Sequence, residues 1–444
     1  MGRRSSRVPL NVYLNDRHVG VLTKLANGAI EFAYDWEWLG WEHALPVSLS
    51  LPLRETRYTG APVSTVFENL LPDFEPIRNR IAERVGSAGS DAFSLLARIG
   101  RDCVGALQFL PTGEQPTPTT EIVGTPVSDD EIAALLANLG RAPLGLDNDV
   151  DDAFRISIAG AQEKTALLYH DGRWHRPHGT TPTTHILKPR IGRLPNGIDL
   201  SDSVENELYC LRLMEAFGFA VPRCARQQFG EHKVLVVERF DRRHTRDGRL
   251  IRLPQEDCCQ ALSVPPAQKY QNQGGPGIAA IMALLKAGDD PSADRLAFFR
   301  SQILFWLIGA TDGHGKNFSV ALHPGGRFSL TPFYDVLSAQ PTFDAGHIKR
   351  DAFKLSMSVG NNGKYRIVEI HGRHFVETAQ ACGMPQSQIV QAITAIRDGL
   401  DHAFEEVRGN LPPDFPEAIA HGIEAAARAR LALLNTAELS ETVL

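Results

Sequence analysis

Apolar and polar residues alternate along residues 12–34, with the period of two that half-buried β-strands show. Asn15-Asp16 and Asn27-Gly28 interrupt this alternation with residues that tolerate positive φ angles, as hairpin turns require. The chain is therefore predicted to begin with a small sheet.

Three more elements are expected before the composition changes. Apolar residues have helical spacing around residues 74–85 and 91–99, and VGALQFL at residues 104–110 is typical of a strand. Residues 111–126 are rich in proline and threonine and poor in apolar residues, which indicates a linker.

A helix and two strands are predicted after this stretch. Ser128 and Glu131 have the spacing of a capping box, AALLANL supplies the apolar stripe, and Gly140 stands where a C-terminal cap is expected. The strands TALLYH and THILKP then follow, and a turn at Asp171-Gly172 comes after the first of them.

Helical patterns dominate the rest of the chain. Val204, Leu208 and Leu211 lie at i, i+4 and i+7 of a helix predicted over residues 202–217, and the apolar strand KVLVVERF follows it. Beyond this strand the helices are interrupted by GGPG and by one β-hairpin, and the last long helix begins after Pro416.

Composition is that of an ordinary globular protein. The chain has 444 residues, 43% hydrophobic residues and a net charge of -6, so it is large enough for two or three cores and is not predicted to be disordered. Its longest apolar run, ILFWLIGA, is too short to cross a bilayer. We expect a soluble, cytoplasmic protein with no membrane partner.

One arginine-rich segment is a candidate for binding an anionic partner. Glu238, Asp241 and Asp247 are interleaved with its arginines, so a solvated, salt-bridged surface is the favoured interpretation. The arginines are Arg239, Arg242, Arg243, Arg246, Arg249 and Arg252.

The cysteines and the first residues carry no processing or metal-binding signal. The six cysteines lack CxxC spacing and are interpreted as reduced thiols of a cytosolic protein. The start MGRRSSRVPL contains an arginine pair and a formal myristoylation match, yet no long apolar segment follows. Both matches are interpreted as coincidental.

Candidate chemistry lies in GATDGHGKNFSV and LTPFYDVLS. Asp312 follows a buried helix in a loop, where its carboxylate can meet a substrate hydroxyl, and Asn317 opens the strand FSVAL. The predicted hairpin returns Asp335 beside Asn317, so that an amide oxygen and a carboxylate can share a hard cation. Kinases place a catalytic aspartate and two Mg²⁺ ligands in this order.

The alternative is that these residues only cap local structure. Asp312 would then cap a turn, Asn317 would lie at a strand edge and Asp335 would cap the next helix. His314 and Lys316 lie in the same loop and could stabilise a transferring phosphoryl group. His314 could instead bind a metal with Asp312, although two ligands make a poor transition-metal site.

Lys188, at the end of THILK, is a candidate for neutralising nucleotide phosphates. Glu207 on the next helix, with Glu205 in reserve, could fix its position. A solvent-exposed lysine is the ordinary alternative. Glu238 and Phe240 end the strand VLVVERF, where an interlobe hinge would present backbone groups to adenine.

The turn SIAGAQEK could bring backbone N–H groups close to phosphates, although it is neither a Walker loop nor GxGxxG. Ser157 in this turn is a candidate phosphorylation site, because a phosphate there would repel nucleotide. Most serines in such turns only make local hydrogen bonds. The residues of the turn assigned to cofactor binding are Ala159, Gly160, Ala161 and Gln162.

These elements together favour an α+β, kinase-like two-lobed fold. A mixed α/β N-terminal part with small sheets would precede a mostly α-helical C-terminal lobe. The expected domains are residues 1–115, a lobe with the nucleotide loop and hinge at residues 128–240, and a lobe with the catalytic loop at residues 241–444.

The chain is similar to the HipA-type serine/threonine kinase toxins of bacterial toxin–antitoxin systems. The motifs that carry this resemblance run in order through nearly the whole chain. They are LTKLANGA, SLSLPL, ENLLPD, IGRDCVGAL, SIAGAQEKTALL, TPTTHILKP, NELYCL, VERFDRR, RLPQED, GGPGIA, LIGATDGHGKNFSV, LTPFYDVLSA and LPPDFPE.

The resemblance implies ATP and Mg²⁺ as cofactors and autophosphorylation as an inhibitory reaction. It places the phosphate-binding lysine at Lys188, the catalytic aspartate at Asp312 and the Mg²⁺ ligands at Asn317 and Asp335. The hinge residues then fall on Glu238 and Phe240, and the autophosphorylated serine on Ser157.

The resemblance also implies partners. These are a HipB-type helix-turn-helix antitoxin, operator DNA held mainly through that antitoxin, and glutamyl-tRNA synthetase as the protein substrate. The alternatives are a small-molecule phosphotransferase, which shares the aspartate and asparagine, and a non-catalytic corepressor.

Overall fold

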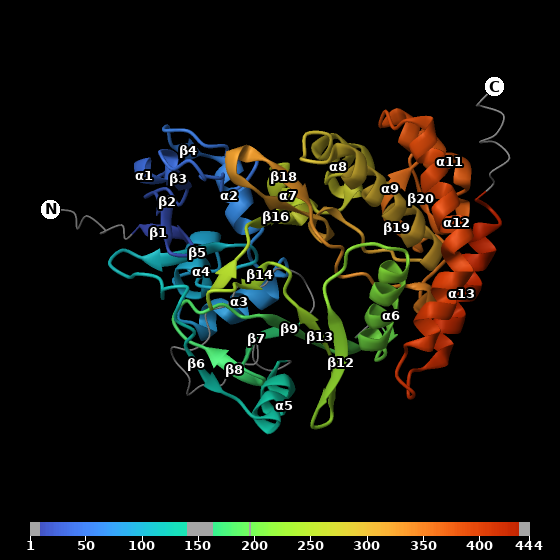
Figure 1. The fold of residues 1–444 in the computed structure, drawn as a ribbon, viewed down its shortest axis with the longest axis horizontal. Coiled ribbons are helices and arrows are strands. Elements are labelled where there is room, and N and C mark those ends of the chain that lie inside the picture. Colours follow the sequence, from blue (N-terminus) through green and yellow to red (C-terminus); the bar gives the residue numbers. More distant parts are fainter. Residues whose placement is uncertain (1–8, 140–162, 195–196, 435–444) are drawn as a thin grey trace. The chain divides into compact units, whose positions relative to one another are not determined.

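The structure is a computed structural model that describes residues 9–139, 163–194 and 197–434. The chain divides into two compact units, each made of three separate segments (Figure 1). Residues 1–189, 227–267 and 320–328 form the first unit, and residues 190–226, 268–319 and 329–444 form the second. Within the described residues, no helix is long and apolar enough to cross a membrane.

The first unit begins with an antiparallel sheet in the order β4-β3-β2-β1-β5. The predicted hairpins are confirmed, with Asn15 at φ 53° and Gly28 at φ 87° in their turns. Helices α2 and α4 pack on this sheet. The elements are β1 Leu10–Leu14, β2 Arg17–Lys24, β3 Ile30–Tyr34, α1 Trp36–Leu39, β4 Tyr58–Thr59, α2 Ala61–Glu68, α3 Glu75–Arg84, α4 Ala92–Ile99 and β5 Leu107–Pro111.

A second sheet has the strand order β12-β13-β9-β7-β8-β6. Asp171 and Gly172 both have positive φ angles, 50° and 75°, which suits the tight turn from β7 to β8. The predicted capping box of Ser128 and Glu131 starts α5. The elements are β6 Gly124–Pro126, α5 Asp129–Asn138, β7 Thr165–His170, β8 Arg173–Pro177, β9 His185–Pro189, β12 Cys224–Phe229 and β13 His232–Glu238.

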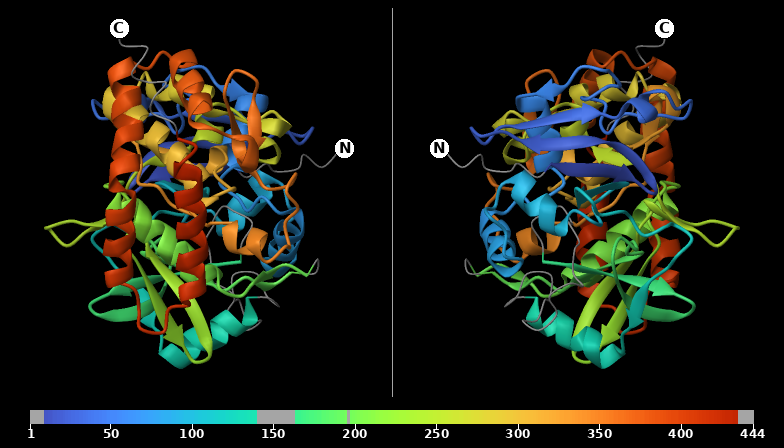
Figure 2. Two further views of the ribbon diagram at one scale, coloured as in Figure 1. Left: turned by 90° about the vertical axis from the view of Figure 1, so that its right-hand side faces the viewer. Right: turned by 90° about the vertical axis from the view of Figure 1, so that its left-hand side faces the viewer.

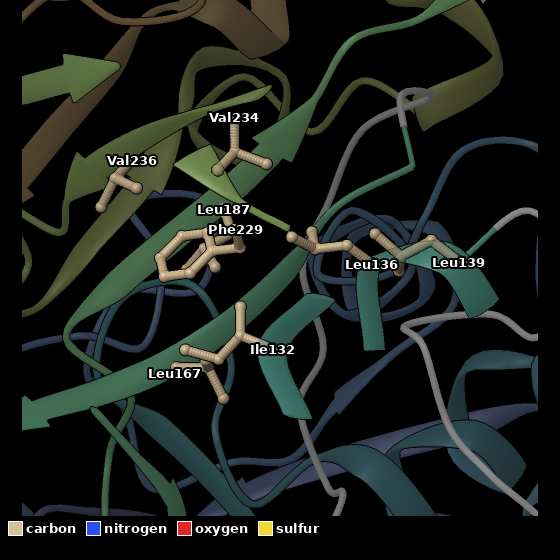
Figure 3. Close-up of a cluster of buried hydrophobic side chains, with 8 residues drawn as sticks. All are labelled: Ile132, Leu136, Leu139, Leu167, Leu187, Phe229, Val234 and Val236. Carbon is tan, nitrogen blue, oxygen red and sulfur yellow. The ribbon is translucent and has the colours of Figure 1, made fainter. Parts of the chain in front are cut away.

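An apolar core joins α5 to this sheet, as Figure 3 shows. Helix α5 contributes one face of it, and strands β7, β9, β12 and β13 contribute the other. Burial of each large aliphatic side chain stabilises the fold by roughly 1.5–3 kcal/mol. The core consists of Ile132, Leu136, Leu139, Leu167, Leu187, Phe229, Val234 and Val236.

The predicted linker at residues 111–126 is instead held by the first unit. Strand β6 at its end pairs with β8. Thr119 is buried, its backbone N–H and hydroxyl both donate to Asp16, and its carbonyl accepts from Leu250 N–H. The low apolar content of residues 111–126 wrongly suggested a linker, because hydrogen bonds rather than buried apolar side chains anchor this segment.

The predicted arginine surface is wrong for three of its members. Arg239, Arg242 and Arg252 are buried with Asp102 and Asp241. Arg242 and Arg252 donate to Asp102 at 2.9 and 3.0 Å, and Arg239 donates to Asp241 at 2.8 Å. Burial by itself raises the pKa of Asp102, but the three guanidinium groups outweigh it and lower the pKa to about 2.

Two small sheets follow in the chain, and three of their strands, β14, β15 and β16, were not predicted from the sequence. Strand β14 pairs with β15, and β16 joins the predicted hairpin of β17 and β18. Each strand is too short for a periodic signal. They are β14 Arg242–His244, β15 Leu250–Arg252, β16 Gln255–Asp257, β17 Ser319–Leu322 and β18 Phe328–Leu330, with the short helix α7 Cys258–Ala261.

The second unit is mostly helical, as predicted. The buried helix α9 packs against α8, α12 and α13, and α12 also packs against α6. Figure 2 shows α12 and α13 as long neighbouring helices. The hairpin of β19 and β20 was not predicted. The elements are α6 Ser203–Ala216, α8 Ile278–Leu285, α9 Pro291–Ile308, α10 Gln340–Asp344, β19 Lys354–Val359, β20 Lys364–Arg366, α11 Gly372–Ala381, α12 Gln386–Gly409 and α13 Glu417–Leu431, with β10 Gly192–Arg193 and β11 Asp199–Leu200.

Candidate active site

Helix α9 gives the candidate catalytic loop a fixed starting point. Its end at Gly309 is left-handed, with φ 70°, a conformation that glycine adopts without strain. The last carbonyls, which have no partner within a helix, are capped from outside. Ser338 Oγ donates to Ile308 O at 2.5 Å, and Arg430 donates to Leu307 O at 2.6 Å.

The loop itself is closed by three hydrogen bonds. Asn317 Nδ2 and His314 N–H both donate to Asp312 O, at 2.7 and 2.8 Å, and Asn317 N–H donates to His314 O at 2.9 Å. Lys316 and Asn317 are buried, whereas 57% of the Asp312 side chain is exposed. The loop therefore presents one carboxylate to the outside on a rigid turn.

The chain returns beside this loop after the hairpin. Thr331 N–H donates to Ser319 O at 3.0 Å, and the Tyr334 hydroxyl donates to Lys316 O at 2.9 Å. These bonds bring the segment that carries Asp335 next to the catalytic loop. Asp335 has φ 59°, a left-handed conformation that is uncommon outside glycine and marks a constrained position.

The interpretation of Asp335 as a helix cap is wrong, because Ala339 is the N-cap of the next helix, α10.

The predicted start of the strand after the catalytic loop also changes. Asn317 ends a 3₁₀ turn, Gly315–Asn317, and β17 starts at Ser319. Asn317 can therefore use its side chain on the loop without disturbing the strand pairing.

Asn206 on α6 holds the backbone just beyond Asp335. Its Nδ2 donates to Ser338 O at 2.8 Å, and its Oδ1 accepts from Ser338 N–H at 2.9 Å. Asn206 and Ser338 are both buried. Sequence reasoning gave a site role only to Glu205 and Glu207 in this helix, because a partner 132 residues away leaves no local signal for the role of Asn206.

Replacing Asn206 with alanine is expected to destabilise the second unit by about 2 kcal/mol, because it leaves two buried backbone groups of Ser338 without these bonds. Urea unfolding followed by tryptophan fluorescence measures the change. The matched control is Asn410→Ala, which removes an exposed amide bond to Glu406 O. Equal midpoints for the two variants would contradict the role of Asn206.

The predicted nucleotide residues lie in the first unit. Lys188 is opposite Leu235 in the pairing of β9 with β13 and is 6% exposed, so the solvent-exposed alternative is wrong. Glu238 is the exposed last residue of β13, and Phe240 lies in the turn that follows. A strand end followed by a turn is compatible with a hinge.

The two glutamates of α6 differ in their surroundings. Glu205 forms an ion pair with Arg226 at 3.3 Å, whereas Glu207 is 2% exposed. Glu207 as the partner of Lys188 stays a prediction. Five predicted site residues lie outside the described part of the chain, as does the predicted helix cap Gly140; the five are Ser157, Ala159, Gly160, Ala161 and Gln162.

The donor set of the loop suits Mg²⁺ better than a transition metal. His314 Nε2 lies 4.0 Å from Asp312 Oδ2, and among the described residues no three His, Cys, Asp or Glu side chains could hold a metal together. Because Nδ2 of Asn317 is fixed on Asp312 O, its amide oxygen is left for another contact. An amide oxygen and the Asp335 carboxylate are hard ligands of the kind that Mg²⁺ prefers.

Tyr270 was missed from the sequence, although it contacts the candidate base directly. Its hydroxyl donates to Asp312 Oδ1 at 2.7 Å, and its ring meets the His314 ring edge-on at 4.9 Å. The two residues are 42 positions apart, and KYQNQ has no pattern that marks a site.

Known proteins resemble this chain over nearly all of its length. The HipA N-terminal domain matches residues 10–110 and the HipA-like C-terminal domain matches residues 156–404. The Y4mE protein of Sinorhizobium fredii, whose name assigns it provisionally as a kinase, is 34% identical over 402 residues, which cover 90% of this chain and 91% of the relative.

A toxin and a solved complex extend this similarity. The serine/threonine-protein kinase toxin HipA of Shewanella oneidensis is 28% identical, over 93% of each chain. A solved structure of HipA from that organism, in a complex with HipB and its operator DNA, has a TM-score of 0.79 and 25% identity, and the match covers 97% of this chain and 99% of that one. The kinase-like fold is thereby confirmed, and this chain belongs to the HipA family of serine/threonine-protein kinase toxins.

Proposed function

We propose that this protein is an ATP- and Mg²⁺-dependent serine/threonine protein kinase that acts as the toxin of a toxin–antitoxin pair. The observation that carries the proposal is the exposed Asp312 carboxylate, held on a turn with Asn317 beside the returning segment of Asp335. Phosphoryl transfer needs mainly positioning and charge neutralisation, which a few fixed groups can supply.

Each group has one task in this proposal. Asp312 accepts the proton of the substrate serine hydroxyl, and Asn317 and Asp335 hold Mg²⁺, which neutralises charge on the nucleotide phosphates. Lys188 binds the nucleotide phosphates. His314 and Lys316, both buried in the loop, keep its shape and stabilise developing charge.

The remaining nucleotide contacts rest on the family resemblance. The backbone at Glu238 and Phe240 receives adenine, and a loop with Ala159, Gly160, Ala161 and Gln162 covers the phosphates. Ser157 in that loop is the autophosphorylated residue, and its phosphate would displace nucleotide by charge repulsion.

We assign partners on the same basis. The solved relative is a complex of HipA with HipB and operator DNA, so a helix-turn-helix HipB-type antitoxin is the expected partner here, and operator DNA is bound mainly through it. The protein substrate that we propose is glutamyl-tRNA synthetase, phosphorylated in the cytoplasm. Its modification would halt growth by stopping translation.

Replacing Asp335 with asparagine is expected to weaken Mg²⁺-dependent ATP binding about tenfold or more, because one charged metal ligand is lost. Isothermal titration calorimetry with ATP, with and without Mg²⁺, measures this change. Asp351→Asn, at an exposed aspartate outside the site, is the matched control. Unchanged affinity in Asp335→Asn would remove Asp335 from the metal site.

The substrate class needs its own experiment. The purified protein is incubated with radioactive ATP and either glutamyl-tRNA synthetase or a panel of small alcohols and aminoglycosides. Labelling of the synthetase supports the protein kinase, and labelling of a small alcohol alone supports a small-molecule phosphotransferase. If the protein did not bind Mg²⁺-ATP at all, the remaining hypothesis would be that it is a non-catalytic corepressor.

A further inference from the structure

We propose that Tyr270 is a positioning residue that fixes the carboxylate of Asp312 and selects Oδ2 as the oxygen that receives the substrate proton. This inference rests on the proposed kinase function. The hydroxyl of Tyr270 donates to Asp312 Oδ1 at 2.7 Å, which is the short distance of a charge-assisted hydrogen bond.

Asp312 needs such a partner because its side chain is 57% exposed. The bonds that close the loop hold only its backbone carbonyl, so they leave the carboxylate free to rotate. With Oδ1 engaged by Tyr270, the carboxylate is fixed and Oδ2 faces away from that bond. His314 Nε2, 4.0 Å from Oδ2, is too distant for a hydrogen bond in this geometry.

The segment around Tyr270 is anchored firmly enough to position another residue. Lys269 O accepts from Gly315 N–H of the catalytic loop at 3.1 Å, and Tyr270 O accepts from Gln273 N–H at 2.9 Å in the 3₁₀ turn Gln271–Gln273. The Lys269 ammonium lies 5.5 Å from the centre of the Tyr270 ring, within the range of a cation–π contact.

The same segment is also bound to the hairpin that starts with β19. Gln271 Oε1 accepts from Ser358 N–H at 2.7 Å. In the same strand, Ser356 Oγ donates to Thr311 O, immediately before Asp312, at 2.6 Å. Strand β19 therefore holds both the segment of Tyr270 and the start of the catalytic loop, so the Tyr270–Asp312 distance is fixed from two sides.

The proton balance of the step is simple in this arrangement. The serine oxygen forms its bond to the γ-phosphorus of ATP, the bond from that phosphorus to the β,γ-bridging oxygen breaks, and the serine proton moves to Asp312 Oδ2. Tyr270 keeps its own proton and remains hydrogen-bonded to Oδ1. It touches neither substrate nor nucleotide in the reaction, so its contribution is orientation.

The test is Tyr270→Phe, which removes the hydroxyl and keeps the ring against His314. We expect kcat to fall about 10- to 100-fold, the effect of losing a hydrogen bond to a charged group. KM for Mg²⁺-ATP and the melting temperature should not change. The control Tyr365→Phe, on β20, should behave as the wild type.

A second variant separates this inference from the kinase assignment. In the Asp312→Asn background, Tyr270→Phe should cause no further loss, because the group that it orients is already disabled. If Asp312→Asn is inactive while Tyr270→Phe keeps the wild-type kcat, the role of Tyr270 is refuted and the kinase assignment stands. A rise in kcat would refute it too, since Tyr270 would then compete with the substrate hydroxyl. A fall in the melting temperature together with a raised KM would reduce Tyr270 to a structural residue.

Discussion

Replacing Asp312 with asparagine is expected to lower the rate of protein phosphorylation by about 10²- to 10⁴-fold, the usual contribution of general base catalysis. Asparagine has nearly the same shape, but its amide cannot accept the serine proton. The backbone carbonyl at position 312 still receives the bond from Asn317, so the loop keeps its conformation. Transfer of radioactive phosphate to the substrate and to the protein itself measures the loss.

The exposed position of Asp312 makes this experiment easy to interpret. Its side chain is 57% exposed, so the variant should melt at the wild-type temperature and bind Mg²⁺-ATP normally. Asp351→Asn again serves as the control. Self-labelling by Asp312→Asn at the wild-type rate would refute the assignment of Asp312 as the base.

The largest loss of stability is expected for Asp102→Asn, which should cost the first unit about 3–5 kcal/mol. Asp102 accepts hydrogen bonds from Arg242 and Arg252 and forms an ion pair with Arg239 at 3.4 Å. Without its charge, three buried guanidinium groups lose an ion pair, and Asp241 contacts only Arg239 and Arg242 among them. Urea unfolding or differential scanning calorimetry measures the change.

The pH dependence of stability gives a second measure of the same network. The guanidinium groups lower the pKa of Asp102 from 3.8 to about 2 against the opposing effect of burial. A carboxylate with a lowered pKa stabilises the fold above its unfolded pKa and loses this contribution as the pH falls through the folded value. The wild type should therefore lose stability between about pH 4 and pH 2, and Asp102→Asn should lose less over that interval.

The control for this variant is Asp171→Asn, in the exposed turn between β7 and β8. Asn tolerates the positive φ angle of 50° found there at least as well as aspartate does. Its effect on stability should stay within about 0.5 kcal/mol. If Asp102→Asn were no more harmful than this change, the buried network would not stabilise the first unit.

Local signals allowed much of the fold to be predicted. Positive-φ residues marked hairpin turns at Asn15 and Gly28, and the capping box at Ser128 marked the start of α5. Helical spacing predicted residues 202–217, where α6 spans Ser203–Ala216. In each case the signal comes from residues within a few positions of each other. The loop of Asp312 and Asn317 was predictable for the same reason.

Contacts across long sequence separations could not be predicted. The arginine-rich segment that starts at Arg239 was predicted to form a solvated surface. Its buried acidic partner Asp102 lies 137 residues before Arg239, so the local sequence gave no sign of the burial. Tyr270 and Asn206 were missed for the same reason. Their side chains act on backbone or carboxyl groups that only the folded chain brings near, and neither residue type indicates a site by itself.

The division of each unit into three segments has a consequence for synthesis of the protein. The polypeptide passes between the two units five times, and the first unit is not complete until Phe328 has left the ribosome. The second unit needs helices that run as far as Leu431. Asp312 and Asn317 are therefore translated well before the unit that contains them can close. The loop that carries Asp312 is therefore expected to reach its folded form only late in synthesis, after the residues of α13 have been made.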